Sequence, residues 1–524
     1  MNWDRRAAPG ARAFMSGRGL VLLLGGLLHA ASTAWPVDFG FLRGQTLWWM
    51  QWSALGLLGW TLLRARNAGQ AFVAGWWFGT VCLAATFWWL FVAMHTYGGL
   101  AAPLAALAVL LLAALLSLYF GAACGLWWRL AQRHAAPSAL VFGVIWMMAE
   151  MARGTWLTGF GWGAGGYAHL DGPLAYYAPW VGVYGVTGLA AGLAMGAARI
   201  GAGRLAPGPR ARVTGLGMAM LIALPLLLPA RWNEWTHGNG SLSVTLLQGN
   251  IPQNEKFEVS TGVARALSWY HTELLGARTA LVVAPETALP VLPQQLPDGY
   301  WDSLRAALDA PGRAAVIGMP LGEETLGYSN SVIGLVAGVG QVQRYDKHHL
   351  VPFGEFIPPF FRWFTALMHI PLGDFNRGGL GQASFAVQGQ RLAPNICYED
   401  LFGEELAARF ADAASAPTIF VNVSNLGWFG DTVAMDQHLA ISRMRALEFQ
   451  RPFVRATNTG ATAILDHHGL ISASLERLTA GTLVGEVQGR EGLTPFARWA
   501  ARFGLWPLWI FGLAVLVWAR QRPA

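Results

Sequence analysis

The sequence predicts a multi-span α-helical membrane domain of about eight transmembrane helices that carries one inserted α/β domain. Three observations lead to this fold class. The composition is 54% hydrophobic and only 12% charged, which is typical of membrane proteins. Long apolar segments fill residues 1–235 and recur near the C-terminus. The stretch between them alternates short β-branched runs with amphipathic runs, as α/β domains do.

Seven apolar segments precede residue 236, and an eighth lies near the end of the chain. Each is close to the roughly 17–25 residues that cross a bilayer. We place them at residues 19–36, 44–63, 70–94, 101–127, 137–152, 176–198, 213–230 and 503–519. The first resembles a signal peptide, but its removal would leave the other spans in place. The expected domains are therefore 1–235 and 496–524 in the membrane and 236–495 outside it.

Arginines flank these spans asymmetrically. They cluster before the first span and after the second, fourth, sixth and last, whereas the connections after the first, third and fifth spans carry at most one each. The clusters are Arg5, Arg6, Arg12 and Arg18, then Arg64 and Arg66, Arg129 and Arg133, Arg199, Arg204, Arg210 and Arg212, and finally Arg520 and Arg522. The positive-inside rule then places both termini in the cytoplasm. The α/β domain is expected on the opposite side, the periplasm of a bacterial cell, and the net charge of +7 reflects topology and not nucleic-acid binding.

The inserted stretch predicts a layered α/β domain of about 240 residues, enough for a substantial core. Short β-branched runs occupy residues 241–247, 279–284, 314–318, 331–342 and 418–423. Residues 262–275 and 436–449 place apolar side chains at three- and four-residue spacing, as in helices that pack on a sheet.

Cys397 is the first candidate for chemistry. The other two cysteines, Cys82 and Cys124, lie inside long apolar segments, so Cys397 has neither a disulfide partner nor a second thiol for a metal cluster. It follows a short apolar run and precedes Glu399 and Asp400, as expected of a nucleophile at the end of a buried strand. The alternative is a buried structural thiol.

Lysine usage supplies a second candidate. Only two of the 36 basic residues are lysines, and a compact ammonium can approach a developing oxyanion more closely than a guanidinium. Lys347 lies in a polar run after a predicted strand, whereas Lys256 lies in a polar segment where we expect no catalytic role. The alternative for Lys347 is a solvated surface lysine.

Glu286 is the third candidate. It follows the predicted strand 279–284 and Pro285. A carboxylate at the buried end of a strand can act as a general base, because desolvation raises its pKa toward neutrality. The alternative is a solvated loop glutamate.

Glu286, Lys347 and Cys397 each lie at or just past the end of a predicted strand. This pattern resembles the Glu-Lys-Cys triad of the nitrilase, or carbon–nitrogen hydrolase, superfamily. Its combination with a multi-span helical domain resembles the apolipoprotein N-acyltransferase family. The matching runs cover residues 247–253, 285–287, 347–355, 396–399 and 428–430. In one departure, Leu426 stands where the family usually has aspartate.

The resemblance implies a nitrilase-like α-β-β-α sandwich and a two-stage acyl transfer. Glu286 would take the thiol proton of Cys397, and the thiolate would attack a phospholipid ester. Lys347 and the backbone N–H of Tyr398 would stabilise the oxyanion. The resulting thioester would pass its acyl chain to the α-amine of the diacylglyceryl-cysteine of an apolipoprotein.

The resemblance also implies supporting roles for Trp235, Glu355 and Glu399, no cofactor and no metal. We expect a monomer in the bacterial inner membrane whose partners are a phospholipid donor and an apolipoprotein acceptor. Trp232, Trp235 and residues 360–368 are expected either to form an apolar arm or to anchor the interface.

Two other readings of function remain. A membrane-tethered amidase or nitrilase would use the same triad with water as acceptor. A transporter or receptor would use the extramembrane domain only to bind ligand, although few ionisable residues lie in the apolar segments. Glu150 and Arg153 are expected to form an i,i+3 pair or to contact a substrate headgroup.

Overall fold

The computed structural model describes residues 17–131, 138–203, 209–308, 312–323, 325–358 and 375–521. The expected apolar arm at 360–368 lies outside the described residues. So do six of the arginines used to predict orientation, namely Arg5, Arg6, Arg12, Arg133, Arg204 and Arg522.

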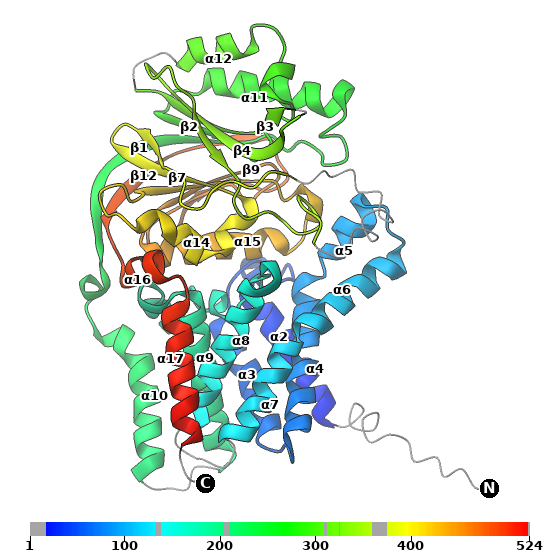
Figure 1. The fold of residues 1–524 in the computed structure, drawn as a ribbon, viewed down its shortest axis with the longest axis vertical. Helices are drawn as coiled ribbons and strands as arrows, with labels where there is room; N and C mark the ends of the chain where they lie inside the picture. Colours follow the sequence, from blue (N-terminus) through cyan, green and yellow to red (C-terminus); the bar gives the residue numbers. More distant parts are fainter. Residues whose placement is uncertain are drawn as a thin grey trace, which may run out of the picture.

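Helices bundled side by side form the lower half of the molecule in Figure 1. Each of the eight predicted apolar segments contains helix. The helices are α2 (Gly17–Thr33), α3 (Trp48–Leu62), α4 (Ala68–Phe87), α5 (Leu90–Val92), α6 (Ala102–Leu116), α7 (Leu118–Ala131), α8 (Ser138–Thr155), α9 (Ala178–Gly201), α10 (Pro209–Leu227) and α17 (Trp506–Arg520).

The predicted count of eight spans is not confirmed by length and composition. Among the described residues, three helical stretches are long and apolar enough to cross a membrane: Ala68–Phe87, Ala102–Ala131 and Pro173–Gly201. The other described helices do not reach both the length and the apolarity that a span requires. Helix α3 has 15 residues, which at about 1.5 Å per residue fall short of a hydrocarbon core of about 30 Å.

The C-terminal segment is a bent pair of helices and not one straight span. Helix α16 (Pro495–Phe503) and α17 meet at an angle of 91°. Phe496, Ala497 and Ala500 of α16 are buried against the α/β part. Helix α17 then runs along the bundle to its far end (Figure 1). Counting this pair as one span brings the total to four.

Two six-stranded sheets form the α/β part. In the first, the strand order is β12-β1-β2-β3-β4-β5, and in the second it is β11-β10-β9-β8-β7-β6. Their strands are β1 (Thr236–Gln248), β2 (Leu281–Ala284), β3 (Ala314–Glu323), β4 (Gly327–Val336), β5 (Gln343–Asp346), β6 (Phe385–Val387), β7 (Gln390–Ile396), β8 (Ile419–Ser424), β9 (Phe453–Thr457), β10 (Ala463–Leu465), β11 (Ile471–Ser474) and β12 (Gly481–Gly492).

The sheets stack face to face, with helices on both outer faces (Figure 1). Their inner faces share a core that includes Val244 and Val283 from one sheet and Ile396 and Val421 from the other. Helices α11 (Ala264–Gly276) and α12 (Tyr300–Leu308) cover the first sheet, and α14 (Gly403–Ala407) and α15 (Ala434–Phe449) cover the second. The predicted α-β-β-α sandwich is confirmed.

The direction of the strands decides where functional residues gather. Strands β1, β2 and β3 are parallel neighbours, and so are β7, β8 and β9. Because parallel strands end at the same edge of a sheet, the residues that follow β2, β7 and β8 meet at one end of the sandwich. One predicted strand is shorter than expected: the run 331–342 ends at Val336, and the chain turns at Gly338, where φ is +72°.

The sandwich rests on the helical bundle through α15. Ala440, Ile441 and Met444 of α15 belong to the same buried cluster as residues of α8 and α9. Polar contacts reinforce this packing. The backbone N–H of Val183 in α9 donates to Glu448 Oε1 of α15 at 2.6 Å. The two halves of the molecule therefore share one continuous core.

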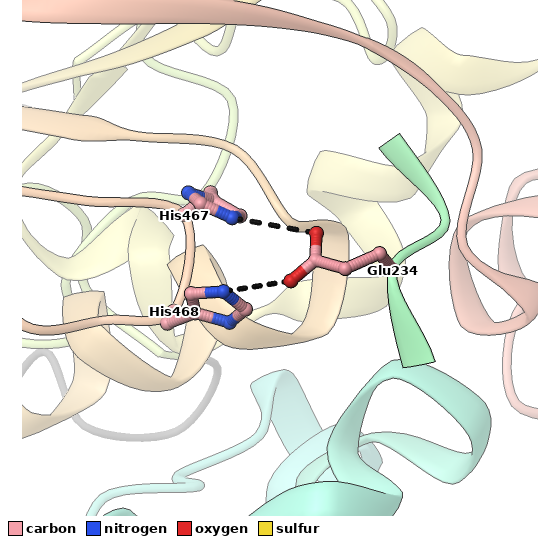
Figure 2. A group of neighbouring side chains, drawn as sticks. All are labelled: Glu234, His467 and His468. Atoms are coloured by element: carbon pink, nitrogen blue, oxygen red, sulfur yellow. Dashed lines mark ion pairs between the residues drawn. The ribbon is translucent and has the colours of Figure 1, made fainter. Parts of the chain in front are cut away.

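A charged cluster fastens the chain where it passes from the bundle into β1. Glu234 Oε1 lies 2.8 Å from His468 Nε2, and Glu234 Oε2 lies 3.5 Å from His467 Nε2 (Figure 2). One ligand atom from each of the three residues can be chosen so that all three lie within 4.8 Å of one another. Arg490 Nη2, however, also contacts Glu234 Oε2 at 3.1 Å. A guanidinium already compensates the carboxylate, so the cluster is best described as an ion-pair junction.

Candidate active site

Cys397 lies directly after β7, which is flanked by β6 and β8 in the second sheet. Its φ is +51°, in the left-handed region that non-glycine residues rarely adopt, and it opens the short turn η9 (Cys397–Leu401). Such strain is common at functional sites. Burial and the nearby Glu286 carboxylate raise the pKa of the Cys397 thiol, which Lys347 only partly offsets. Cys397 is therefore protonated at rest.

A buried polar network supports the backbone of Cys397. His438 Nε2 lies 3.1 Å from the Cys397 carbonyl oxygen. Arg455 Nη2 donates to His438 Nδ1 at 2.9 Å, which leaves the histidine proton on Nε2. Asp400 Oδ2 accepts from Arg455 Nη1 at 3.2 Å, and Asp400 Oδ1 lies 3.0 Å from His438 Nε2. Burial raises the pKa of Asp400, but these partners outweigh burial and hold the pKa below its usual value.

Glu286 follows β2 and faces the same end of the sandwich. Its Oε1 accepts from Asn330 Nδ2 at 2.8 Å and from Lys347 Nζ at 3.2 Å. Its Oε2 accepts from the backbone N–H of Asn425 at 2.9 Å. Burial raises the pKa of Glu286, but Lys347 and Asn330 outweigh it and hold the pKa below its usual value. The expectation that desolvation raises this pKa toward neutrality is wrong.

Lys347 follows β5 and is only 1% exposed. Its Nζ donates to Glu355 Oε1 at 2.8 Å as well as to Glu286. Burial lowers the pKa of Lys347, yet the two carboxylates raise it above its usual value. The alternative of a solvated surface lysine is thereby excluded.

Glu355 and Asn330 complete this hydrogen-bonded group. Glu355 Oε1 accepts from Asn330 Nδ2 at 2.7 Å, and its Oε2 accepts from the backbone N–H of Val351 at 2.8 Å. Asn330 therefore bridges Glu286 and Glu355 from β4. No sequence pattern had singled out Asn330, because its position near Glu286 arises from the pairing of β2 with β3 and of β3 with β4.

Glu399 ties the strand of Cys397 to the segment after Lys347. It accepts hydrogen bonds from the backbone N–H groups of Ile396 at 2.6 Å and His348 at 2.6 Å. The Tyr345 hydroxyl also donates to it, at 2.8 Å. Burial raises the pKa of Glu399, and these donors only partly offset the effect. Glu399 thus fixes the relative positions of two candidate catalytic residues.

Tyr398 connects the site to the helical bundle. Its side chain is buried among residues of the bundle, and its hydroxyl donates to the carbonyl of Gly159 at 3.1 Å. The neighbouring His349 makes a parallel contact, with Nε2 3.0 Å from the carbonyl oxygen of Thr158. One loop after α8 therefore contacts a residue that follows Lys347 and a residue that follows Cys397.

Trp235 lies apart from the candidate triad. Its backbone N–H donates to Gln450 Oε1 at 2.8 Å, its indole N–H donates to Asn233 Oδ1 at 3.2 Å, and its ring packs edge-on against Trp180. These contacts place it at the junction between bundle and sandwich. Trp232 nearby is 61% exposed.

Lys256 is a buried residue of the site that sequence reasoning missed. Its side chain is 2% exposed, and its Nζ donates to the backbone carbonyl of Glu286 at 3.2 Å. Burial lowers the pKa of Lys256 to about 8, although the charge of Glu286 favours the ammonium. The expectation that Lys256 has no part in the site is wrong. The scarcity of lysine was the signal that could have found it.

Two remaining candidates have clear structural roles. Leu426, where the resemblance expects aspartate, is fully buried. Glu150 Oε2 pairs with Arg153 Nη2 at 2.9 Å inside the bundle, and Arg153 also donates to the carbonyl of Trp162 at 2.9 Å. Both side chains of this pair are at most 1% exposed, so it holds the loop after α8 and does not face a headgroup.

Comparison with known proteins agrees with this arrangement. Residues 25–196 match the family model described as apolipoprotein N-acyltransferase N-terminal domain, and residues 243–495 match carbon-nitrogen hydrolase. The chain thus combines a carbon–nitrogen hydrolase domain with a helical N-terminal domain.

Curated relatives extend the match over nearly the whole chain. The apolipoprotein N-acyltransferase of Verminephrobacter eiseniae (strain EF01-2) is 55% identical over 95% of this chain and 95% of its own length. The protein of the same name from Ralstonia nicotianae is 47% identical over 86% of each chain. That of Bordetella bronchiseptica is 41% identical over 92% of this chain and 94% of its own. The chain belongs to the apolipoprotein N-acyltransferase family.

Proposed function

We propose that this protein transfers an acyl chain from a membrane phospholipid to the free α-amine of the diacylglyceryl-cysteine of apolipoproteins, through a thioester on Cys397. The observation that carries the proposal is the meeting of Glu286, Lys347 and Cys397 at one end of the sandwich, in a chain of this family. The family relationship supports the N-acylation of lipoproteins as the overall reaction.

The first half-reaction forms the acyl-enzyme. Glu286 is ionised at neutral pH and Cys397 is protonated, so the resting pair is stable until a carbonyl carbon arrives. As the sulfur attacks the phospholipid ester, its proton passes to Glu286 and the carbonyl oxygen becomes an oxyanion. Lys347 has three N–H donors and uses two on Glu286 and Glu355, which leaves one for the oxyanion. The lysophospholipid leaves with the proton that Glu286 held.

The second half-reaction is the transfer proper. The α-amine of the acceptor attacks the thioester carbon, and Glu286 accepts the proton that the nitrogen loses. As the Cys397–carbonyl bond breaks to give an amide, Glu286 passes this proton to the departing sulfur, which restores the Cys397 thiol and the ionised Glu286. Glu355 holds Lys347 in place throughout, and Glu399 and Tyr398 hold the backbone on either side of Cys397. Trp235 supports the junction with the bundle. These roles require no diffusible cofactor.

The membrane setting is part of the proposal. Donor and acceptor both carry acyl chains, so a site held at the membrane surface meets them where they reside. The outer face of α6 exposes leucines that water would disfavour, including Leu107, Leu111 and Leu115. We place residues 1–235 and 496–524 in the bacterial inner membrane as about eight helices, with residues 236–495 in the periplasm, both termini cytoplasmic and the chain monomeric.

Mass spectrometry of the protein purified from membranes tests the proposal. The peptide containing Cys397 should carry an acyl mass that hydroxylamine removes. The Cys397→Ser variant should remain folded in the membrane but give no transfer, because an alcohol is far less acidic than a thiol. Transfer to an amine also separates this reaction from hydrolysis, which would release free fatty acid. Normal turnover by Cys397→Ser would refute the assignment of the nucleophile.

A further inference from the structure

We propose that Lys256 is a positioning residue of the acyl-transfer site, whose ammonium supplies the second positive charge that the site needs to form the Cys397 thiolate. The inference rests on the proposed function, because it concerns the nucleophile of that reaction. It adds a lysine to the group formed by Glu286, Lys347 and Cys397.

The location of Lys256 is unusual for a lysine. Its side chain is 2% exposed, whereas lysine is seldom fully buried without a paired charge. Its only hydrogen bond recorded among the described residues goes to the neutral backbone carbonyl of Glu286, and no carboxylate of those residues lies within 4.0 Å. A buried ammonium without an ion pair costs stability, which favours a functional reason for its retention.

The segment that carries Lys256 is held firmly. Gly262 packs so tightly against this segment that a Cβ there would collide with the backbone carbonyl oxygen of Glu255. Gln253 accepts a hydrogen bond from Asn425 Nδ2 at 2.8 Å, and Asn425 in turn donates its backbone N–H to Glu286. Lys256 is therefore attached to the Glu286 segment through two routes, one by its own side chain and one by Asn425.

The charges of the site explain what Lys256 adds. Lys347 binds two carboxylates, Glu286 and Glu355, so one of the two negative charges is left without a cation. Asn330 and backbone N–H groups contribute dipoles but no charge. When the ammonium of Lys256 is included, the charges of the two glutamates and the two lysines sum to zero.

This balance persists during thiolate formation. The S–H bond of Cys397 breaks and an O–H bond forms on Glu286, so the thiolate, Glu355, Lys347 and Lys256 again sum to zero. Without Lys256 the thiolate would form in a buried site of net charge −1, which electrostatics disfavours.

The other charged groups that face Cys397 are compensated elsewhere. Asp400 is paired with Arg455 at 3.2 Å and with His438 at 3.0 Å. Glu399 is held by backbone N–H groups and by the Tyr345 hydroxyl. Neither group supplies the missing positive charge. Because burial lowers the pKa of Lys256 to about 8, its contribution should decline in mildly alkaline solution.

The test measures the reactivity of Cys397 without any lipid substrate. Full-length protein in detergent is alkylated with iodoacetamide between pH 6 and 10, and mass spectrometry follows the Cys397 peptide, so that Cys82 and Cys124 do not interfere. The variants are Lys256→Met, which removes the charge, and Lys256→Arg, which keeps it. Lys256→Met should slow alkylation at pH 7.5 by about tenfold or more, the effect of one pKa unit on the thiolate fraction. Lys256→Arg should recover most of this loss.

The outcomes separate this inference from the proposed function. An unchanged pH profile of alkylation in Lys256→Met would show that Lys256 only supports the fold, and the inference would be overturned. If Lys256→Met does not accumulate in membranes, Lys256→Gln makes the same comparison, with thermal unfolding as the control for folding. The proposed function is tested independently, by the hydroxylamine-labile acyl group on Cys397 of the unaltered protein.

Discussion

Replacing Lys347 by arginine should slow formation of the acyl-enzyme by on the order of 10²–10³, the usual effect of removing one oxyanion donor. The charge is kept, but the geometry is not. The Nζ atom lies between two carboxylate oxygens at 2.8 and 3.2 Å, and Asn330 occupies the same two oxygens at 2.7 and 2.8 Å. A planar guanidinium is larger and directs its five donors differently, so it cannot keep both contacts and also point a donor at the carbonyl oxygen.

The assay is single-turnover acylation of Cys397, quantified by mass spectrometry. Arg344→Lys is the matched control. Arg344 lies in β5, three positions before Lys347, and its side chain is 51% exposed. The substitution again exchanges one cation for the other. The control should acylate at the normal rate. The reasoning fails if Lys347→Arg retains more than about a tenth of the normal rate, because a guanidinium would then serve equally well.

Three further predictions address topology, pH and metals. Alkaline phosphatase fused after residue 240 should be active, and the same fusion after residue 520 should be inactive, because alkaline phosphatase is active only in the periplasm. The reverse pattern would contradict the proposed orientation. The lowered pKa of Asp400 contributes stability that is present above the usual carboxyl pKa of about 3.9 and is lost as pH falls through the lower folded value. Asp400→Asn should therefore flatten the acid end of a plot of unfolding temperature against pH, whereas an unchanged slope would mean that Asp400 contributes nothing there. Dialysis against EDTA should leave acyl transfer intact, since the triad supplies nucleophile, base and oxyanion donor; a loss that Zn²⁺ restores, except in Glu234→Gln, would reveal a functional metal in the cluster with His467 and His468.

The sequence located the candidate triad because each member follows a strand. Glu286 comes after β2, Lys347 after β5 and Cys397 after β7, and polar residues stand out where a buried β-branched run ends. Residues further from a strand end were harder to find. Asn330 lies within β4, where nothing in its local pattern distinguishes it from a structural asparagine.

The apolar helices of the bundle show the limit of composition as a guide. All eight apolar segments are helical, yet length and apolarity single out only three or four of them. Helix α8 contains the pair Glu150 and Arg153, which an apolar lipid environment would exclude if the two side chains faced it. Inside the bundle the pair satisfies its own charges and holds the loop after α8. Helix α8 therefore tolerates two ionisable side chains because they are buried among other helices, which its hydropathy alone does not reveal.

The sequence pointed to Glu286 as a candidate site residue but predicted the wrong direction for the shift of its pKa. Burial alone was considered, and burial alone does raise the pKa of a carboxyl group. The sign is decided instead by Asn330 and Lys347, which lie 44 and 61 positions further along the chain. The same long-range assembly brought Lys256 into the site. A base with a lowered pKa and a thiol with a raised pKa exchange a proton only when the product charges are stabilised, so the two lysines and not the depth of burial should govern when Cys397 reacts.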